Sequence, residues 1–245
     1  MILSLFKSKP KLRDLIPEGF VDIHSHILPG IDDGAKNVEE SFKMISEMKN
    51  LGFSKIIGTP HTYPGIYDNT NISIKNSHDK ISKRIDLDIE ISFASEYMLD
   101  VSLIKKANEK TLLTLPHNYV LLEMSFINKH NYLYDIIFQI QTNGYIPIIA
   151  HPERYLYLEK DFKSFIKLKN LGCKFQINLF SLTGYYGKKI IKISEKLLKN
   201  KLIDFVGSDI HNSIQLTEFS KKIMISEILE INKCIANNKI FKIKT

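Results

Sequence analysis

The chain has little cysteine and no long hydrophobic run, and these absences exclude several classes of protein. Its 245 residues include two cysteines, and Cys173 and Cys234 form no CxxC pair, so we expect neither a disulfide framework nor a redox motif. The apolar start is too short for a signal peptide, and no apolar run approaches the roughly 18 residues of a membrane span. We therefore expect a cytoplasmic protein without membrane insertion.

A nucleophilic cysteine for phosphate-ester cleavage is also excluded. Cysteine-dependent tyrosine phosphatases need an arginine at the sixth position after the cysteine. This chain has Leu179 and Ile240 at those positions. Any phosphatase activity must therefore use another nucleophile.

Length and composition fit one large α/β domain. The chain matches the roughly 250 residues typical of an α/β barrel, and 44% hydrophobic residues suffice for a substantial core. The net charge of +7 comes from dispersed lysines, many of them on predicted helix faces, which favours a solvated surface over a nucleic-acid interface. We expect an N-terminal arm over residues 1–18 and a single catalytic domain over residues 19–245.

Strand-like and helix-like segments alternate, which predicts a parallel sheet. Helical spacing of apolar residues predicts helices at Val38–Leu51, Ile72–Ile85, Tyr132–Thr142, Asp161–Leu171, Lys188–Asn200 and Thr217–Asn232. Short apolar runs predict seven strands, at Phe20–His24, Lys55–Thr59, Ile89–Ala94, Tyr119–Glu123, Ile146–Ala150, Lys174–Asn178 and Ile203–Gly207.

Potential metal ligands follow the ends of these strands. Because the carboxyl ends of parallel barrel strands converge in space, we expect these side chains to form one site. The set contains histidines and carboxylates but no cysteine, which suits hard or borderline divalent metals. The nine candidates are His24, His26, Asp33, His61, Glu96, Glu123, His151, Asp209 and His211.

Each candidate also has a simpler interpretation. His24 and His26 lie two residues apart on a strand and share a face, although an isolated HxH pair is a weak signal. Asp32 and Asp33 precede a glycine and could form a turn or a helix N-cap. We favour Asp33 over Asp32 as a ligand. The recurrence of such residues at several strand ends favours the metal site.

The remaining polar candidates divide into two kinds. Glu96 or Glu123 alone could be a surface carboxylate, but closely spaced metals favour a shared anionic ligand that offsets their repulsion. His78, His117 and His130 lie in predicted helices or loops, and we expect them on the surface.

Taken together, these motifs resemble the PHP superfamily, and within it the manganese-dependent protein-tyrosine phosphatases of bacterial capsule and exopolysaccharide clusters. The resemblance runs from about Gly19 to Asn212. It rests on the opening segment DIHSHILPGIDDGA, on Thr59-Pro60-His61, on His151-Pro152-Glu153-Arg154 and on Asp209-Ile210-His211. It implies a distorted seven-stranded (β/α) barrel of PHP type that binds three divalent metal ions.

The resemblance also implies roles for individual residues. One metal would be held by His24, His26, Glu96 and Asp209, a second by Asp33, His61 and His211, and a third by Glu96, Glu123 and His151. Manganese is favoured by the family likeness, and Fe, Zn or Mg would suit the same ligands. The candidate catalytic residues are Arg154, at the phosphate-contacting position, Asp209 and His211. A second arginine that these phosphatases commonly carry is absent from Asn212–Leu216.

The implied activity is hydrolysis of phosphotyrosine on a bacterial tyrosine kinase of capsule or exopolysaccharide synthesis, with the kinase tail as partner. A small-molecule phosphatase, such as histidinol-phosphate phosphatase, is the main alternative. An exonuclease or polymerase-associated module is disfavoured by the single-domain length and the dispersed lysines. Four loop tyrosines could accept a tyrosine ring or could simply pack the loops: Tyr63, Tyr67, Tyr185 and Tyr186.

Overall fold

A computed structural model of the chain describes residues 9–82 and 89–242. Each of the seven predicted strands is present within two residues of its predicted bounds, and two further short strands follow β2 and β4. The strands are β1 (Phe20–Ser25), β2 (Phe53–Gly58), β3 (His61–Thr62), β4 (Glu90–Phe93), β5 (Glu96–Met98), β6 (Tyr119–Glu123), β7 (Ile146–Ala150), β8 (Lys174–Asn178) and β9 (Phe205–Gly207).

Most α-helices connect one strand to the next. They are α1 (Val38–Asn50), α2 (Asn71–Ser82), α3 (Ser102–Asn108), α4 (Leu133–Thr142), α5 (Phe162–Asn170), α6 (Lys188–Lys199) and α7 (Ile228–Asn237). The start of α1 is capped by Asn37, whose side chain accepts a hydrogen bond from Glu40 N. Helix α3 has no counterpart among the predicted helices, and residues 83–85 of the second predicted helix lie outside the described residues.

All pairs of described strands are parallel, but they form two sheets. One has the order β1-β2-β4 and the other β3-β5-β6-β7-β8-β9. The break after β2 falls at Pro60, which has no N–H group to donate to a strand ladder. Isolated hydrogen bonds continue across the break, with Glu96 N donating to Pro60 O at 3.1 Å. A parallel bridge joins Ser25 to Ile210. The parallel α/β class is confirmed, whereas a closed seven-stranded barrel is not.

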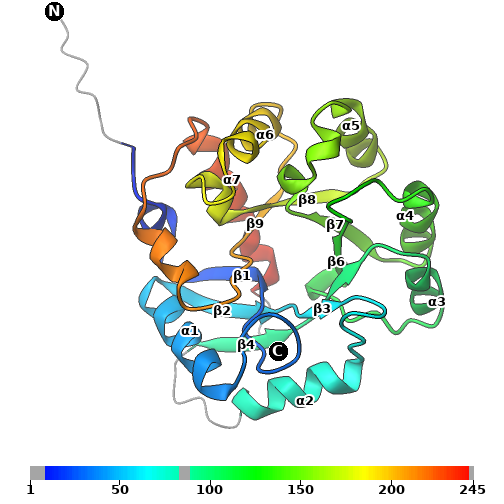
Figure 1. Ribbon diagram of the computed structural model, residues 1–245, viewed down its shortest axis with the longest axis horizontal. Coiled ribbons are helices and arrows are strands. Elements are labelled where there is room, and N and C mark those ends of the chain that lie inside the picture. Colours follow the sequence, from blue (N-terminus) through cyan, green and yellow to red (C-terminus); the bar gives the residue numbers. More distant parts are fainter. Residues whose placement is uncertain (1–8, 83–88, 243–245) are drawn as a thin grey trace, which may run out of the picture.

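Helices lie around the outside of the strands (Figure 1). The larger hydrophobic cluster includes helix residues such as Ile45 of α1 and Leu197 of α6. A smaller cluster joins Leu121 of β6 and Ile148 of β7 to Phe241 near the end of the chain. These apolar strand residues precede Glu123 at the end of β6 and His151 just after β7. The fold therefore separates an apolar interior from a polar edge at the carboxyl ends of the strands.

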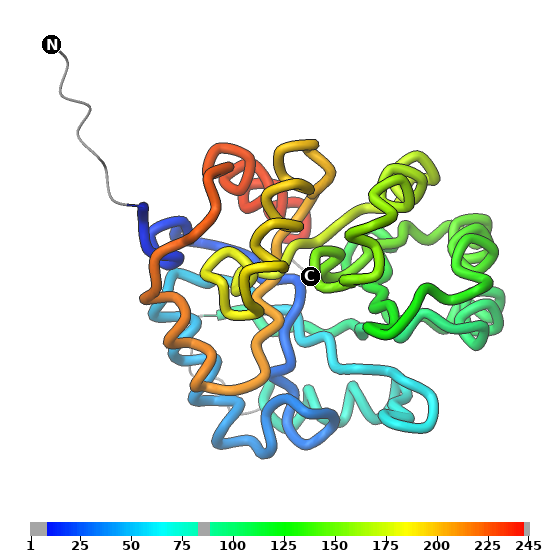
Figure 2. Tube along the Cα trace, turned by 45° about the horizontal axis from the view of Figure 1, so that its top comes forward, coloured from blue at the N-terminus to red at the C-terminus, as the bar shows by residue number. Residues whose placement is uncertain are grey.

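The last predicted helix, Thr217–Asn232, is wrong. The structure has a short 3₁₀ helix, η6 (Gln215–Ser220), then non-helical chain, and α7 begins later. The intervening backbone pairs with the N-terminal segment, where Leu12 N donates to Lys221 O at 2.9 Å. Figures 1 and 2 both show the dark-blue start of the described chain beside this orange segment. Because Leu12 is fully buried, this segment packs against the domain.

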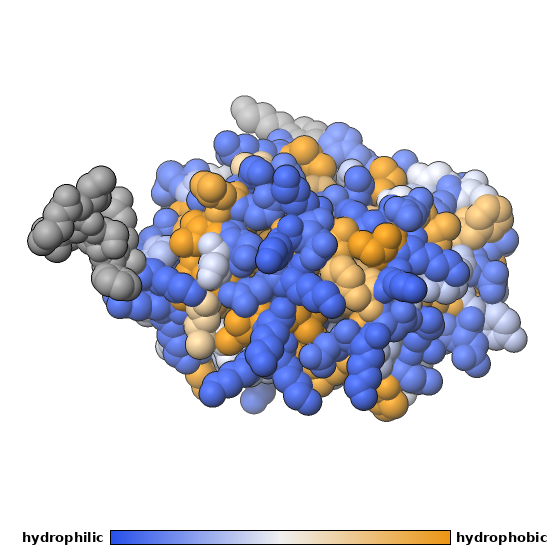
Figure 3. Space-filling view, turned by 90° about the horizontal axis from the view of Figure 1, so that it is seen from above, coloured by the Kyte–Doolittle hydropathy of each residue, from blue (hydrophilic) through white to orange (hydrophobic). Residues whose placement is uncertain are grey.

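The lysines on α6 are solvated, as the sequence predicts. Lys188, Lys192, Lys196 and Lys199 are all exposed, while the residues between them that face the core are buried. Figure 3 shows a mostly hydrophilic face with small apolar patches between the polar side chains. None of the described helices is both long enough and apolar enough to cross a membrane.

Candidate metal centre

The nine predicted ligand residues come together at the carboxyl ends of the strands. They form three groups in which the potential ligand atoms lie within 4.8 Å of one another. Every one of the nine belongs to at least one group: His26, Asp33, His61 and His211; His24, Glu96, His151 and Asp209; and His61, Glu96 and Glu123. In contrast, His78, His117 and His130 belong to none of these groups.

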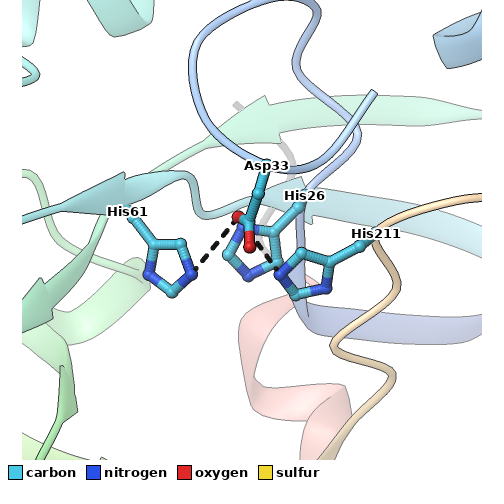
Figure 4. A group of neighbouring side chains, drawn as sticks. All are labelled: His26, Asp33, His61 and His211. Atoms are coloured by element: carbon cyan, nitrogen blue, oxygen red, sulfur yellow. Dashed lines mark ion pairs between the residues drawn. The ribbon is translucent and has the colours of Figure 1, made fainter. Parts of the chain in front are cut away.

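Figure 4 shows the first group, in which Asp33 reaches from the loop after β1 toward two histidines. Asp33 Oδ1 lies 3.6 Å from His61 Nε2 and 3.5 Å from His211 Nε2. The rings of His26 and His211 stack with their centroids 3.8 Å apart. These ligands come from the segment after β1, from β3 and from the segment after β9, so only the folded chain brings them together.

The second group is centred on the buried carboxylate of Glu96, at the start of β5. Glu96 Oε2 lies 3.2 Å from His24 Nε2, and Oε1 lies 3.2 Å from His151 Nε2. His24 Nε2 is also 3.2 Å from Asp209 Oδ1. Glu96 Oε2 is fully buried and has no hydrogen-bond partner. A buried carboxylate oxygen without a donor, facing imidazole nitrogens, fits a position where a cation binds.

The third group shares Glu96 and His61 with the other two. His61 Nδ1 lies 3.1 Å from Glu96 Oε2 and 3.5 Å from Glu123 Oε2. A carboxylate that belongs to two groups can bridge two cations. The grouping differs from the one implied by the resemblance, because His26 lies with Asp33 and His151 lies with His24. His26 Nε2 nevertheless remains 3.4 Å from Glu96 Oε2.

Two residues outside the predicted set orient His24, in β1, and His26, just after it. Asp32 Oδ2 lies 2.7 Å from His26 Nδ1, and Gln176 Oε1 lies 2.7 Å from His24 Nδ1. If each Nδ1 donates to its partner, Nε2 is left free to face the ligand cluster. Asp32 therefore contacts a candidate ligand, whereas Asp33 itself belongs to one of the ligand groups. Sequence reasoning missed Gln176, although a polar residue between the apolar Phe175 and Ile177 marks it.

The carboxylates and imidazoles alter each other's ionisation. Burial by itself would raise the pKa of Glu96, but the charges of His24 and His61 hold it well below its usual range. Burial, with the nearby charge of Glu96, raises the pKa of Glu123 well above its usual range. Burial and the charge of Arg154 lower the pKa of His151 to about 4. His151 is therefore neutral at pH 7, as a metal ligand must be.

Backbone strain accompanies two of the candidate ligands. His151 has φ 31° and Asp209 has φ 53°, left-handed values that non-glycine residues seldom adopt. Gly207, the last residue of β9, leaves room for the site, since a Cβ there would lie 2.7 Å from His24 Cβ. Strain and a required glycine at the strand ends are typical of functional rather than structural positions.

Arg154 lies at the edge of the cluster and is bonded to one of its carboxylates. Its Nη1 donates to Asp209 Oδ2 at 2.8 Å. The guanidinium lies between two aromatic rings, 4.7 Å from the centroid of Phe126 and 4.5 Å from that of Tyr186. Glu153 instead accepts hydrogen bonds from Asn178 N and Ser181 Oγ. Arg154 therefore forms an ion pair with Asp209 rather than with its sequence neighbour Glu153.

Comparison with known proteins identifies the class of protein to which this fold and site belong. The family model described as "Capsular polysaccharide synthesis, CpsB/CapC" matches residues 20–223. Because this match spans most of the chain, the protein belongs to the CpsB/CapC family. The family resemblance seen in the sequence motifs is confirmed.

Individual relatives cover most of the chain. It is 33% identical over 196 residues to the tyrosine-protein phosphatase YwqE of Bacillus subtilis, covering 78% of this chain and 77% of the relative. It is 30% identical over 201 residues to the tyrosine-protein phosphatase CpsB of Streptococcus pneumoniae, covering 78% and 83%.

Solved structures support the same relationship. A structure from work on YwqE and CpsB, described as "unique metal-dependent tyrosine phosphatases", aligns with a TM-score of 0.76 at 31% identity and covers 86% of each chain. A lactonase from Listeria monocytogenes aligns with a TM-score of 0.55 at 11% identity over 94% of this chain and 97% of its own. The second match shows a shared fold only.

Proposed function

We propose that this protein is a metal-dependent phosphatase that hydrolyses phosphotyrosine in proteins. The observation that carries the proposal is Glu96 Oε2, which is buried, lacks a hydrogen-bond donor and lies beside three histidines. Membership of the CpsB/CapC family supports it, because relatives at 30–33% identity are named tyrosine-protein phosphatases.

The donor set fits divalent cations. All nine side chains offer nitrogen or oxygen, and their ligand atoms lie close enough together in each group to surround one ion. We infer three ions in this cluster, with Glu96 as their shared ligand and manganese as the expected metal. The ligands would be His24, His26, Asp33, His61, Glu96, Glu123, His151, Asp209 and His211.

Bound cations would supply positive charge for the phosphoryl oxygens and a water acidic enough to ionise near neutral pH. Arg154 adds a guanidinium that Asp209 and two aromatic rings hold in place, so that its remaining N–H groups can bind a phosphoryl oxygen. Phenoxide, with a pKa of about 10 for tyrosine, leaves readily enough that no strong general acid is required. Asp209 and His211 complete the proposed catalytic set.

The proposed substrate is a phosphotyrosine-bearing tail of a tyrosine kinase of capsule or exopolysaccharide synthesis, with the reaction taking place in the cytoplasm. Both cysteines are free and buried, which is consistent with a reducing compartment.

The proposed domain organisation keeps residues 19–245 as one catalytic unit, arranged as a distorted (β/α) barrel. Histidinol phosphate remains the competing substrate because it would use the same metals.

One purified sample can test the proposal. The protein is stripped with a chelator, reloaded with Mn²⁺, and assayed on a phosphotyrosyl peptide and on histidinol phosphate. We expect metal-dependent hydrolysis of the peptide and much slower hydrolysis of histidinol phosphate. The reverse preference would assign the small-molecule activity instead.

Matched histidine variants separate ligand loss from general damage. His24→Ala should bind less metal and lose activity, whereas His117→Ala, at an exposed position outside the cluster, should retain both. Elemental analysis measures metal content independently of turnover. Full metal content and full activity in His24→Ala would refute the proposed site.

A further inference from the structure

A pocket of about 310 Å³ lies beyond the carboxyl ends of β3, β5 and β6. Its wall includes Met98 and Leu99, which are 8% and 3% exposed, and the two tyrosines Tyr63 and Tyr132. The proposed metal centre uses none of these side chains. The pocket is therefore a separate feature of the same edge of the fold.

The pocket begins where the ligand cluster ends. Met98 follows Glu96 by two residues on β5, so both side chains lie on one face, about 7 Å apart along the strand. Tyr63 follows the ligand His61 by the same step just beyond β3. The strands are in register, because β3 pairs His61 with Glu96 and β5 pairs Met98 with Glu123. The pocket wall at Met98 therefore lies beside two candidate ligands, Glu96 along the strand and Glu123 on the neighbouring strand.

The chemistry of the pocket favours an uncharged ring. Some of its polar side chains already have partners: Asp100 accepts a hydrogen bond from Ser102 N at 2.6 Å, and His130 accepts one from Tyr132 N at 3.1 Å. Lys129 lies 3.8 Å from Asp161. The volume is at the lower end of the roughly 300–1,000 Å³ of ligand pockets, which suits one side chain. Aromatic walls pack well against an aromatic ring.

We propose that this pocket binds the phenyl ring of phosphotyrosine while the phosphoryl group lies at the ligand cluster. The inference rests on the proposed phosphatase function and identifies the part of the protein that selects tyrosine. A phosphoserine side chain is too short to fill the pocket, so the pocket favours aryl over alkyl phosphates.

The test is the ratio of kcat/KM for a phosphotyrosyl peptide to that for the same peptide with phosphoserine. Asn131→Trp, at an exposed position of the pocket wall, should fill the space, and Tyr132→Ala should remove an aromatic wall. Each should lower the ratio roughly tenfold, the first because the ring no longer fits and the second because one aromatic contact is lost. Tyr132→Phe keeps the ring and should keep the ratio. The matched control, Asn232→Trp at an exposed position on α7, should also keep the ratio.

The outcomes distinguish the pocket from the function on which it rests. If the metal-loaded wild type hydrolyses neither peptide, both proposals fail. If the wild type prefers phosphotyrosine and both pocket variants retain its ratio, with wild-type metal content and melting temperature, the pocket assignment alone fails. The pocket assignment also fails if the pocket variants change only the preference for residues that flank the phosphotyrosine in the peptide. The pocket would then bind a flanking residue rather than the phenyl ring.

Discussion

Replacing Asp32 tests whether residues outside the ligand set control metal binding. Asp32 Oδ2 accepts from His61 N at 3.1 Å and pairs with His26 Nδ1 at 2.7 Å. Its other oxygen, Oδ1, accepts from Gly34 N at 2.9 Å. Burial would raise the pKa of this carboxyl, but the charge and hydrogen bond of His26 lower it to about 2. Asp32 is therefore ionised at neutral pH and holds two ligand positions.

The size of the effect follows from these contacts. Asp32→Asn removes the charge and replaces one accepting oxygen with an NH₂ group, so at least one of the three donors loses its acceptor. Loss of an outer carboxylate behind a metal ligand typically lowers affinity or activity by about 10- to 100-fold. Because Asp32 supports both His26 and His61, we expect an effect near 100-fold, or about 2.7 kcal/mol.

The assay is calorimetric titration of the metal-free protein with Mn²⁺, followed by kinetics on a phosphotyrosyl peptide. Asp68→Asn is a matched control, because Asp68 Oδ1 also accepts from a glycine N, that of Gly65 at 2.8 Å, but Asp68 is exposed. Melting of the metal-free proteins checks that both variants fold. If Asp32→Asn binds Mn²⁺ as tightly as Asp68→Asn does, the proposed effect of Asp32 on metal affinity is refuted.

Three further predictions follow from burial and charge at the site. Burial raises the pKa of Glu153 from 4.5 to about 7, so the stability that the neutral carboxyl provides is present below pH 4.5 and is lost as the pH rises through about 7. Glu153→Gln should therefore be more stable than wild type at pH 8, by up to about 3 kcal/mol, and should be about as stable as wild type at pH 4. An equal gain at both pH values would contradict this. Burial raises the pKa of Cys173 and of Cys234 to about 12, so alkylating reagents should leave the folded enzyme active, whereas a chelator should stop it. Inactivation by alkylation would count against the mechanism. Arg154→Lys should lose at least about tenfold in kcat/KM, because lysine cannot reproduce the planar donor set, with metal content unchanged; wild-type kinetics would remove Arg154 from the site.

The sequence by itself determined seven of the described strands, though not β3 and β5, and the positions of the ligand candidates. Strand identity follows from local runs of apolar residues, and the polar residues that end those runs must lie at one edge of a parallel sheet. For that reason His61, Glu123 and His151 could be assigned to a common site before their contacts were known. The family resemblance rested on the same short motifs.

Only the tertiary structure decided which side chains meet. His24 lies beside Gln176, 152 residues away in the chain, and Arg154 pairs with Asp209 rather than with its neighbour Glu153. Such contacts depend on strand order and on the twist of the sheets, which local periodicity does not encode.

The predicted helix at Thr217–Asn232 failed for the same physical reason. Its spacing of apolar residues is compatible with a helix, but hydrogen bonds with the N-terminal segment, such as Leu12 N to Lys221 O, hold that backbone in another conformation. The break at Pro60 likewise divides the expected ring of strands into two sheets. Local sequence determines what each segment prefers, and the packing of distant segments determines which preferences prevail.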